Sequence, residues 1–338
     1  MVMLRLEKRE KMQEIVEAPQ ETKGLTEKQI ADRKNWYSQT YIAYLISSYC
    51  KGRETMFLNL HPDYRDRVRY LNFGTIDFLF KGIGIPTHSQ IMAHEKPQDP
   101  FSFFSPKKNY SIYCSLATVD WAKSDVKAFS YHGITRKQQQ EVFKEKIEEF
   151  LVDFDGFFDM DGDFDGYEGN VPKKIEITQE EAVMRSLRDL RVLIKFLDNY
   201  KINYWVQFSG NRGFHAFYKV PLDVSFNRKV EISNSVLKEV AETLNLRTVD
   251  KTSLNTRKVA KCCYSLTTKG ENTYVCLPLS SEQISSFKLG DMKVNNILRD
   301  VRLKDRGLLV RNQNINKAES IDNFKKMLKD LEIQYAEQ

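Results

Sequence analysis

Apolar residues recur at helical spacing in several segments of the chain. Residues 26–50 carry aromatic side chains three and four positions apart, which is typical of a buried helix face. Residues 178–199 open with Thr-Gln-Glu-Glu, a capping box, and continue with a leucine-rich stripe, so a helix is expected there. Similar patterns predict helices over residues 229–246 and 321–331, and residues 137–149 read as a surface helix.

Short apolar runs between turn residues predict strands. YSIYCSLATV at 110–119 reads as a mostly buried strand, and FLVDFD at 150–155 as a strand whose end alternates. NYWVQFS at 203–209 and FHAFYKV at 214–220 flank a glycine-containing turn and predict a hairpin. Helices and strands alternate irregularly, so we expect an α+β fold with a mixed β-sheet and flanking helices.

Composition places the chain among globular proteins that need no cross-links. It has 338 residues, 41% of them apolar, and a net charge of +6. Its five cysteines are an odd number without a C-x-x-C pair, so neither a disulfide framework nor a zinc knuckle is indicated. The N-terminal region lacks a signal-peptide core, and no apolar stretch is long enough to span a bilayer. We therefore expect an intracellular, cytoplasmic or nucleoid-associated protein without a membrane partner.

Charge is distributed unevenly along the chain. Residues 153–168 form an acidic run, whereas basic residues gather at 65–69, 107–108 and 257–261. An acidic focus in a mildly basic chain is compatible with binding cations and polyanions together. The same runs also occur on ordinary solvated surfaces, and charge alone does not choose between these interpretations.

Asp153 and Asp155 lie two positions apart on the predicted strand at 150–155. Alternation puts both carboxylates on one face, about 6 to 7 Å apart at the backbone, where they could share metal ions. Carboxylate oxygens suit Mg²⁺ or Mn²⁺. The alternative is that the strand end is simply solvated.

The loop that follows the strand resembles a calcium site, which is an alternative to Mg²⁺ or Mn²⁺ in this region. Asp161-x-Asp163-x-Asp165-Gly166 opens like a calcium-binding EF-hand loop, but Pro172 stands at the twelfth position, where a bidentate glutamate is required. A loose calcium site and a solvated turn both remain open for this segment.

The segment from Ser209 to His215 reads Ser-Gly-Asn-Arg-Gly-Phe-His. Its two glycines permit a turn that lets a ligand approach the backbone, and Ser209, Arg212 and His215 could converge on phosphate oxygens. A plain hairpin turn with a locally satisfied histidine explains the same spacing equally well.

Asp250 follows a short apolar strand and precedes the basic residues Arg257, Lys258 and Lys261. A third carboxylate would complete a metal-binding trio, and basic groups nearby would face the anionic ligands that such metals attract. By itself, however, the segment is also a strand that ends in a basic loop.

Taken in order, these three segments resemble the archaeo-eukaryotic primase superfamily. LVDFD, FSGNRGFH and TVDKTSLNTRKVAKCCYSL are similar to the three motifs of primase small catalytic subunits and primase-polymerases. The resemblance covers residues 65–269 and implies a catalytic core of the primase-polymerase type.

Site residues follow from this resemblance. It implies that two divalent ions, Mg²⁺ or Mn²⁺, are held by the catalytic carboxylates Asp153, Asp155 and Asp250. It implies that the nucleotide triphosphate is bound by Ser209, Arg212, His215 and Lys261. Arg69 matches a basic position that contacts elongation-site phosphates. Arg, Lys and His would then offset the charge that develops during in-line phosphoryl transfer.

The chain departs from the family pattern in two places. Archaeal small subunits commonly carry a zinc knuckle between the first two motifs, whereas no cysteine lies between Cys114 and Cys262 here, so no zinc is expected. Ser265-Leu266-Thr267 replaces the usual Ser-Leu-His, and Cys263 occupies a proline position. A specialised primase-polymerase fits these departures at least as well as a replicative subunit.

The sequence thus predicts a DNA primase-polymerase that makes primers from nucleoside triphosphates on a single-stranded DNA template. An accessory primase or replication protein is a further expected partner. We expect a charged tail or helix at 1–25, a catalytic domain at 26–290, and a linker with an amphipathic helix at 291–338. A two-metal nuclease and a non-catalytic nucleic-acid-binding module are the alternatives.

Overall fold

The computed structural model describes most of the second half of the chain and parts of the first. The described residues are 25–37, 39, 42, 45–46, 49–50, 53–59, 67–70, 110–118, 146–147, 150–159, 173–250, 259–299 and 317–335. The predicted tail at 1–25 therefore lies outside them except for its last residue.

Helices and strands alternate along the described chain. The helices are α2 (Glu27–Tyr37), α7 (Gln179–Asn199), α8 (Phe226–Thr243), α9 (Ser281–Ser285), the 3-10 helix η1 (Leu289–Met292), α10 (Val294–Arg299) and α12 (Lys317–Asp330). The strands are β1 (Arg53–Asn59), β2 (Arg67–Tyr70), β3 (Tyr110–Thr118), β4 (Lys146–Ile147), β5 (Phe150–Asp155), β6 (Phe158–Asp159), β7 (Lys173–Lys174), β8 (Tyr204–Phe208), β9 (Gly213–Tyr218), β10 (Val259–Lys261), β11 (Leu266–Lys269), β12 (Asn272–Val275) and β13 (Pro278–Leu279). The predicted α+β class is confirmed.

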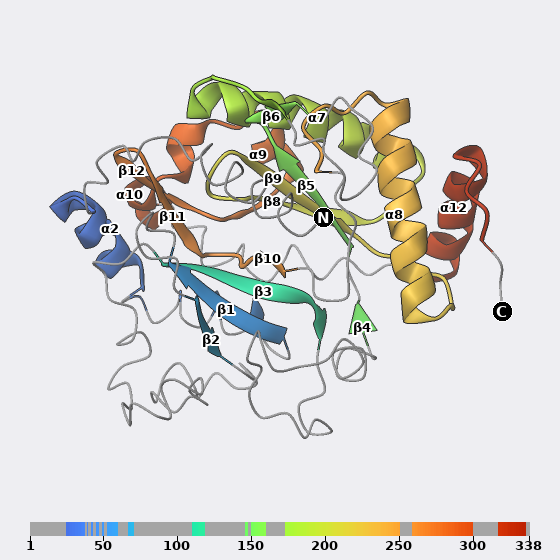
Figure 1. Ribbon diagram of the computed structural model, residues 1–338, viewed down its shortest axis with the longest axis horizontal. Helices are drawn as coiled ribbons and strands as arrows, with labels where there is room; N and C mark the ends of the chain where they lie inside the picture. The colour runs from blue at the N-terminus through green and yellow to red at the C-terminus, as the bar shows by residue number, and fades with distance from the viewer. Residues whose placement is uncertain are drawn as a thin grey trace, which may run out of the picture.

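Two larger sheets form the centre of the molecule. One has the order β13-β8-β9-β5, and the other has the order β10-β3-β1-β2 with β4 paired to β3. In Figure 1 the first sheet lies above the second, with α7 across the top. Two small hairpin-like pairs, β6 with β7 and β11 with β12, complete the described strands.

The predicted mixed sheet is not observed among the described strands, where every pairing is antiparallel. The reason is the position of β9. In the sequence, β5 precedes α7 and β8 follows it, and the two strands run in the same direction. In the sheet, however, β9, the second strand of the β8–β9 hairpin, lies between them. The helical connection from β5 to β8 would make them parallel neighbours if they were adjacent. Because β9 separates them, the sheet has the antiparallel pairs β5–β9 and β8–β9 instead.

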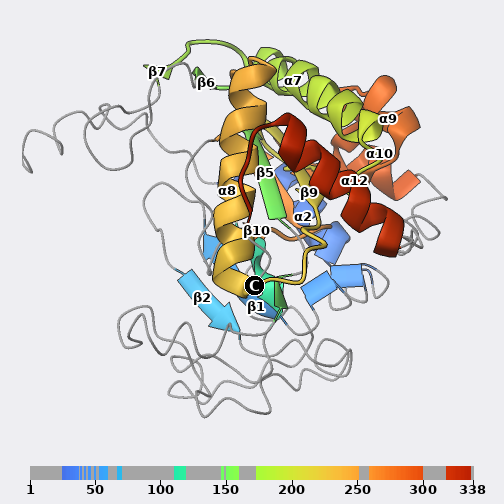
Figure 2. The ribbon, with the colours of Figure 1, turned by 90° about the vertical axis from the view of Figure 1, so that its right-hand side faces the viewer.

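Helices α7 and α8 cover one face of the β13-β8-β9-β5 sheet. Val152 and Val249 line an apolar cavity together with Leu193 of α7 and Val236 of α8. Figure 2 shows α8 beside this sheet, with α12 and α7 nearby. α12 is tied to the same domain because the hydroxyl of Tyr200 donates to the Asp330 carboxylate at 2.9 Å.

The helix predicted at 178–199 is confirmed together with its capping box. The hydroxyl oxygen of Thr178 accepts from the backbone N–H of Glu181, and the Glu181 carboxylate accepts from the backbone N–H of Thr178. The surface helix expected at 137–149 is wrong at Lys146–Ile147, which is strand β4 paired with β3; residues 137–145 and 148–149 lie outside the described part of the chain. Across the described residues, no helix is both long and apolar enough to cross a membrane.

The aromatic stripe near the N-terminus belongs to the core. Trp36 and Tyr37 are buried, and the Trp36 indole N–H donates to the carbonyl of Tyr264 at 2.8 Å. The backbone N–H of Leu266 donates to the Tyr37 hydroxyl at 3.1 Å. These contacts fix the segment after β10, which carries part of the site described next.

Candidate active site

Three polar side chains lie side by side across three strands. Asp153 of β5 pairs with His215 of β9, and His215 pairs with Gln207 of β8. Directly paired residues of antiparallel strands point to the same face, so the three form a row. The Nε2 atom of His215 lies 3.4 Å from Oδ1 of Asp153, and Nδ1 lies 2.7 Å from Nε2 of Gln207.

This row faces away from α7 and α8. Val152 precedes Asp153 and lines the apolar cavity under those helices, so alternation turns Asp153 to the opposite side. On that side lies β10 of the other sheet, since the Gln207 amide also donates to the carbonyl of Lys261 at 2.8 Å. The polar row is therefore positioned where the two sheets approach each other.

Asp250 joins the other edge of β5. Val249 forms an antiparallel bridge with Phe154, and the backbone N–H of Asp250 donates to the carbonyl of Asp153 at 2.8 Å. Val249 and Phe154 are buried toward the helices, so Asp250 faces the same side as Asp153 and Asp155. The three carboxylates, predicted from two separate motifs, thus share one face of neighbouring strand segments.

Burial is the main influence on the Asp155 carboxyl. It raises the pKa of Asp155 to about 6, although Arg212 and a hydrogen bond from the backbone N–H of Phe157 act in the opposite direction. The negative charges of Asp153 and Asp250 raise the pKa further. Burial, with a smaller contribution from the neighbouring carboxylates, therefore outweighs the effect of Arg212 on the pKa of Asp155.

Arg212 forms an ion pair with one of these carboxylates. Its Nε atom lies 2.8 Å from Oδ2 of Asp155. The Arg212 side chain keeps 38% of its surface exposed, compared with 17% for Asp155. An ion pair with this much solvent contact is exchangeable, so Arg212 can leave Asp155 for another anion.

The turn that carries Arg212 is fixed by its backbone. The N–H and the hydroxyl of Ser209 both donate to the carbonyl of Gly213, at 3.0 and 2.9 Å. Gly210 has a φ of 82°, which a glycine adopts without strain. The amide of Gln179 in α7 donates to the carbonyl of Asn211 at 2.7 Å, so α7 also holds the turn.

Lys261 brings a second cation from the other sheet. It is buried, its Nζ donates to the hydroxyl of Thr267, and it lies 5.6 Å from the ring centroid of Tyr113. Burial lowers the pKa of Lys261 to about 8, and Arg212 adds to that effect, whereas Cys276 and Asp153 oppose it. The ammonium form therefore still dominates at neutral pH.

Divalent metal ions fit the donor chemistry of this face. Hard carboxylate oxygens gather on one side, where burial chiefly and mutual repulsion to a smaller extent raise the pKa of Asp155, and Mg²⁺ or Mn²⁺ would stabilise their charged forms. The three aspartates are nevertheless spread out: among the described residues, only a cysteine group brings three metal-ligating atoms within 4.8 Å of one another. Arg212 also holds Asp155, so an ion at this carboxylate would have to compete with it.

Other predicted site positions are described only in part or not at all. Arg69 lies on β2 and pairs with Met56 of β1, but its side chain is outside the description. The calcium-like loop at 161–166 and the basic residues Arg257 and Lys258 lie outside the described residues.

Two contributors were missed by the sequence interpretation. Gln207 contacts His215, Lys261 and the thiol of Cys263, which donates to Oε1 of Gln207 at 2.8 Å. Thr267 accepts from Lys261 and lies so close to Gly210 that an added Cβ there would be 3.1 Å from its hydroxyl. The available signal for Gln207 was strand alternation, which places it on the same face as Ser209. Thr267 stands in Ser265-Leu266-Thr267, the departure noted after the third motif, but no site role was predicted for it.

Comparison with known proteins gives likenesses to solved structures alone. The chain matches no family model and no curated protein. It is similar in structure to the polymerase domain of Mycobacterium tuberculosis ligase D, which was solved in complex with DNA, with a TM-score of 0.46 and 12% sequence identity. The alignment covers 82% of this chain and 92% of that domain. The chemistry assigned to the site therefore depends on its own residues.

Proposed function

We propose that this protein is a template-directed nucleotidyltransferase, a primase-polymerase that synthesises primers from nucleoside triphosphates on single-stranded DNA. One observation carries the proposal. Three carboxylates from two motifs share a face beside a guanidinium, an imidazole and an ammonium group, all supplied by elements that the fold brings together. Nucleotidyl transfer needs this combination, because it joins a metal-dependent attack with binding of a triphosphate.

The carboxylates Asp153, Asp155 and Asp250 would hold two divalent ions. When bound, the ions supply positive charge that activates a 3′-hydroxyl and neutralises the phosphates. The chain contributes the orientation of the three carboxylates, which the strand ladder fixes through the hydrogen bonds between β5 and the segment ending at Asp250. Such fixed geometry costs little reorganisation during the reaction.

The cationic and donor groups would bind the triphosphate. Arg212 presents a planar guanidinium from an exchangeable ion pair, and Lys261 presents an ammonium from the opposite sheet. His215 donates from Nε2, because its Nδ1 accepts a hydrogen bond from Gln207. Ser209 lies at the start of the same turn, and its hydroxyl, which donates to the Gly213 carbonyl, would turn to donate to a phosphate oxygen instead.

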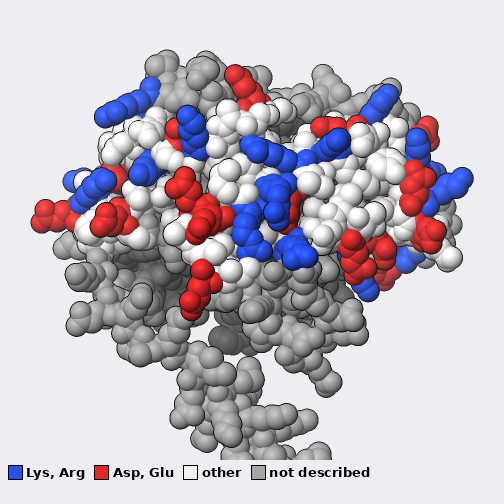
Figure 3. All heavy atoms as spheres, turned by 90° about the horizontal axis from the view of Figure 1, so that it is seen from above, with Lys and Arg blue, Asp and Glu red and all other residues white. Residues whose placement is uncertain are grey.

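The template would follow basic and aromatic groups on the site side of the molecule. α7 exposes Arg188, Arg191 and Lys195, and basic side chains gather on the face seen in Figure 3. These residues of α7 would not contact the template, because α7 covers the sheet face opposite the carboxylates. Phosphate contacts near the site would give DNA binding without sequence preference and with strong dependence on salt.

Primer synthesis on unprimed single-stranded DNA tests the proposal. The full chain is incubated with Mg²⁺ or Mn²⁺ and with dNTPs, NTPs or both, and products are resolved by length. Asp153→Asn and Asp155→Asn should abolish synthesis, whereas Asp223→Asn, the same change at an exposed residue after β9, should keep it.

Each outcome separates the proposal from its alternatives. De novo product that depends on Asp153 and Asp155 supports a primase and reveals the preferred sugar. Extension of a supplied primer without initiation would reduce the assignment to a polymerase that needs an accessory protein. Degradation of the template by the unaltered chain would favour a two-metal nuclease, and DNA binding without any chemistry would favour a binding module.

A further inference from the structure

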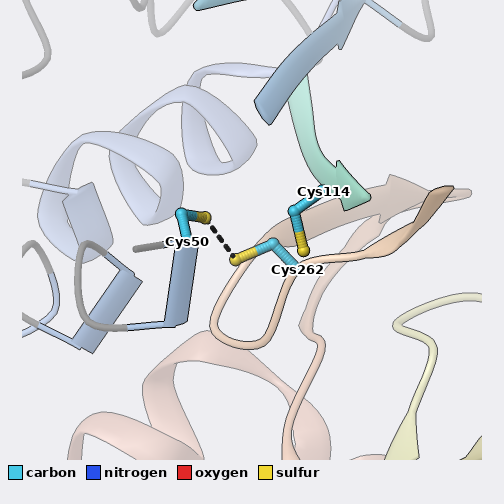
Figure 4. A group of neighbouring side chains, drawn as sticks. All are labelled: Cys50, Cys114 and Cys262. Carbon is cyan, nitrogen blue, oxygen red and sulfur yellow. Dashed lines mark hydrogen bonds between the residues drawn. The ribbon is translucent and has the colours of Figure 1, made fainter. Parts of the chain in front are cut away.

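Three buried cysteines that are far apart in the sequence lie close together in the structure. Cys50 comes from the helical segment before β1, Cys114 lies on β3, and Cys262 directly follows β10. Figure 4 shows their side chains turned toward one another. The sulfur atoms all lie within 4.8 Å of each other, and those of Cys50 and Cys262 are 3.4 Å apart. Within the described part of the chain, no other set of His, Cys, Asp or Glu gathers three ligand atoms so closely.

This spacing matches a metal coordinated by thiolates. With a metal–sulfur bond of about 2.3 Å, three sulfur ligands stand roughly 3.8 to 4.0 Å apart in tetrahedral or trigonal geometry. The observed limits, 3.4 Å for one pair and 4.8 Å for the whole group, bracket those values. Side-chain movements of a few tenths of an ångström would be sufficient to close the group around an ion.

The backbone holds the cluster in place. Ala260 of β10 pairs with Cys114 of β3, and the N–H of Cys262 donates to the carbonyl of Ile112 at 2.8 Å. Two of the three ligands thus come from adjacent segments of one hydrogen-bonded ladder. Exposed fractions of 0% for Cys50, 1% for Cys114 and 0% for Cys262 keep solvent away.

We propose that Cys50, Cys114 and Cys262 bind one thiophilic closed-shell metal ion, Zn²⁺ or Cu⁺, at a structural site separate from the carboxylates. Soft thiolate ligands select these ions over Mg²⁺ and Mn²⁺. Binding forms three metal–sulfur bonds, and the thiol protons pass to the buffer. Cu⁺ is favoured because it accepts three ligands, whereas Zn²⁺ usually takes four. Zn²⁺ is favoured because, together with three thiolates, it leaves less net negative charge in the core than Cu⁺ does.

The site has a consequence for the proposed active centre. Cys262 follows Lys261, so an ion held there would tie the strand that presents the Lys261 ammonium to both β3 and the N-terminal helical segment. Sequence spacing gave no sign of this, because Cys50 and Cys262 are 212 positions apart and no C-x-x-C pair exists. The metal is structural, so its test needs no nucleotide chemistry and stands apart from the proposed function.

Cobalt substitution and metal titration test the site. The full chain, free of any affinity tag, is reduced, stripped of metal and titrated with Co²⁺, whose thiolate charge-transfer absorption reports sulfur ligation. Zn²⁺ displacement of Co²⁺ and competition for Cu⁺ with a chromophoric chelator then distinguish the two ions. We expect about one ion per chain, and a higher melting temperature with the ion bound, since a ligand that binds only the folded state stabilises it.

Three variants test the cluster: Cys50→Ala, Cys114→Ala and Cys262→Ala. Cys276→Ala is the matched control. Cys276 is equally buried but lies outside the cluster. Each cluster variant should lose the charge-transfer band, and the Cys276 variant should keep it. If a cluster variant does not fold, the Co²⁺ titration and the melting temperature of the unaltered chain still test the proposal. Absence of the band and of any melting shift would overturn the proposal, as would a band that survives all three cluster substitutions.

Discussion

Gln207 fixes the protonation pattern of His215. Its amide nitrogen lies 2.8 Å from the carbonyl oxygen of Lys261, which can only accept, so that atom is the –NH₂ group. The same nitrogen lies 2.7 Å from Nδ1 of His215 and therefore donates its second hydrogen there. Nδ1 must be unprotonated, which leaves the imidazole proton on Nε2, the nitrogen that faces Asp153.

Gln207→Glu should reverse this tautomer. A carboxylate accepts from Nδ1–H, so the proton would move to Nδ1 or the ring would carry both protons. Nitrogen-15 NMR of the histidine ring reports the change directly. We expect nucleotide transfer to fall about 10- to 100-fold, the range typical of residues that orient a ligand-binding side chain. An unchanged ring spectrum would refute the assigned tautomer.

His215→Ala should weaken nucleotide binding much more than DNA binding. The imidazole Nε2–H faces the carboxylate side, where the triphosphate is proposed to bind. Loss of one hydrogen bond to a charged group corresponds to about 1.5 to 3 kcal/mol, or roughly 10- to 150-fold in affinity. Fluorescent nucleotide and labelled single-stranded DNA are titrated separately, and equal losses for both would indicate a structural role instead.

Asp155→Asn should stabilise the metal-free protein above pH 6 while it abolishes synthesis. Burial raises the pKa of Asp155 from 3.8 in the unfolded chain to about 6 in the folded one. Between those values the folded state binds more protons, so this group makes the free energy of unfolding fall as the pH rises. Asn cannot ionise, and the variant should gain up to about 3 kcal/mol at pH 7.

Urea unfolding in the presence of a chelator measures this difference. The advantage of Asp155→Asn should shrink as the pH falls from 6 to 4, where the carboxyl in both states becomes protonated. Asp223→Asn, at an exposed position, is the control and should follow the unaltered chain. A variant less stable than the unaltered chain at pH 7 would mean that the Arg212 ion pair outweighs burial.

Gly213→Ala should disrupt the junction between the turn and β5. A Cβ at Gly213 would lie 1.7 Å from the carbonyl oxygen of Phe154, so one of the two strands must move. We expect a loss of about 3 kcal/mol or more in the free energy of unfolding. Gly290→Ala is the matched control, because nothing lies within 4 Å of its added Cβ and the change should be within about 0.5 kcal/mol.

The amino-acid sequence determined the local elements whose signals lie in neighbouring residues. The capping box at Thr178 and the apolar stripe after it define α7, and the glycines on either side of Arg212 define the turn between β8 and β9. Alternation along residues 150–155 put Asp153 and Asp155 on one face. Each of these depends on backbone geometry over a few residues, which a pattern can report.

The resemblance of the three motifs predicted that Asp153, His215 and Lys261 share a site, but tertiary structure decided how these distant residues meet and brought in Gln207 and the cysteines. The insertion of β9 between β5 and β8 made the sheet antiparallel and set Asp153, His215 and Gln207 in one row. The pairing of β10 with β3 brought Lys261 to that row and Cys262 to Cys114. The geometry of such contacts arises from burial of whole faces and from strand order, which the pattern of residues within one segment does not report.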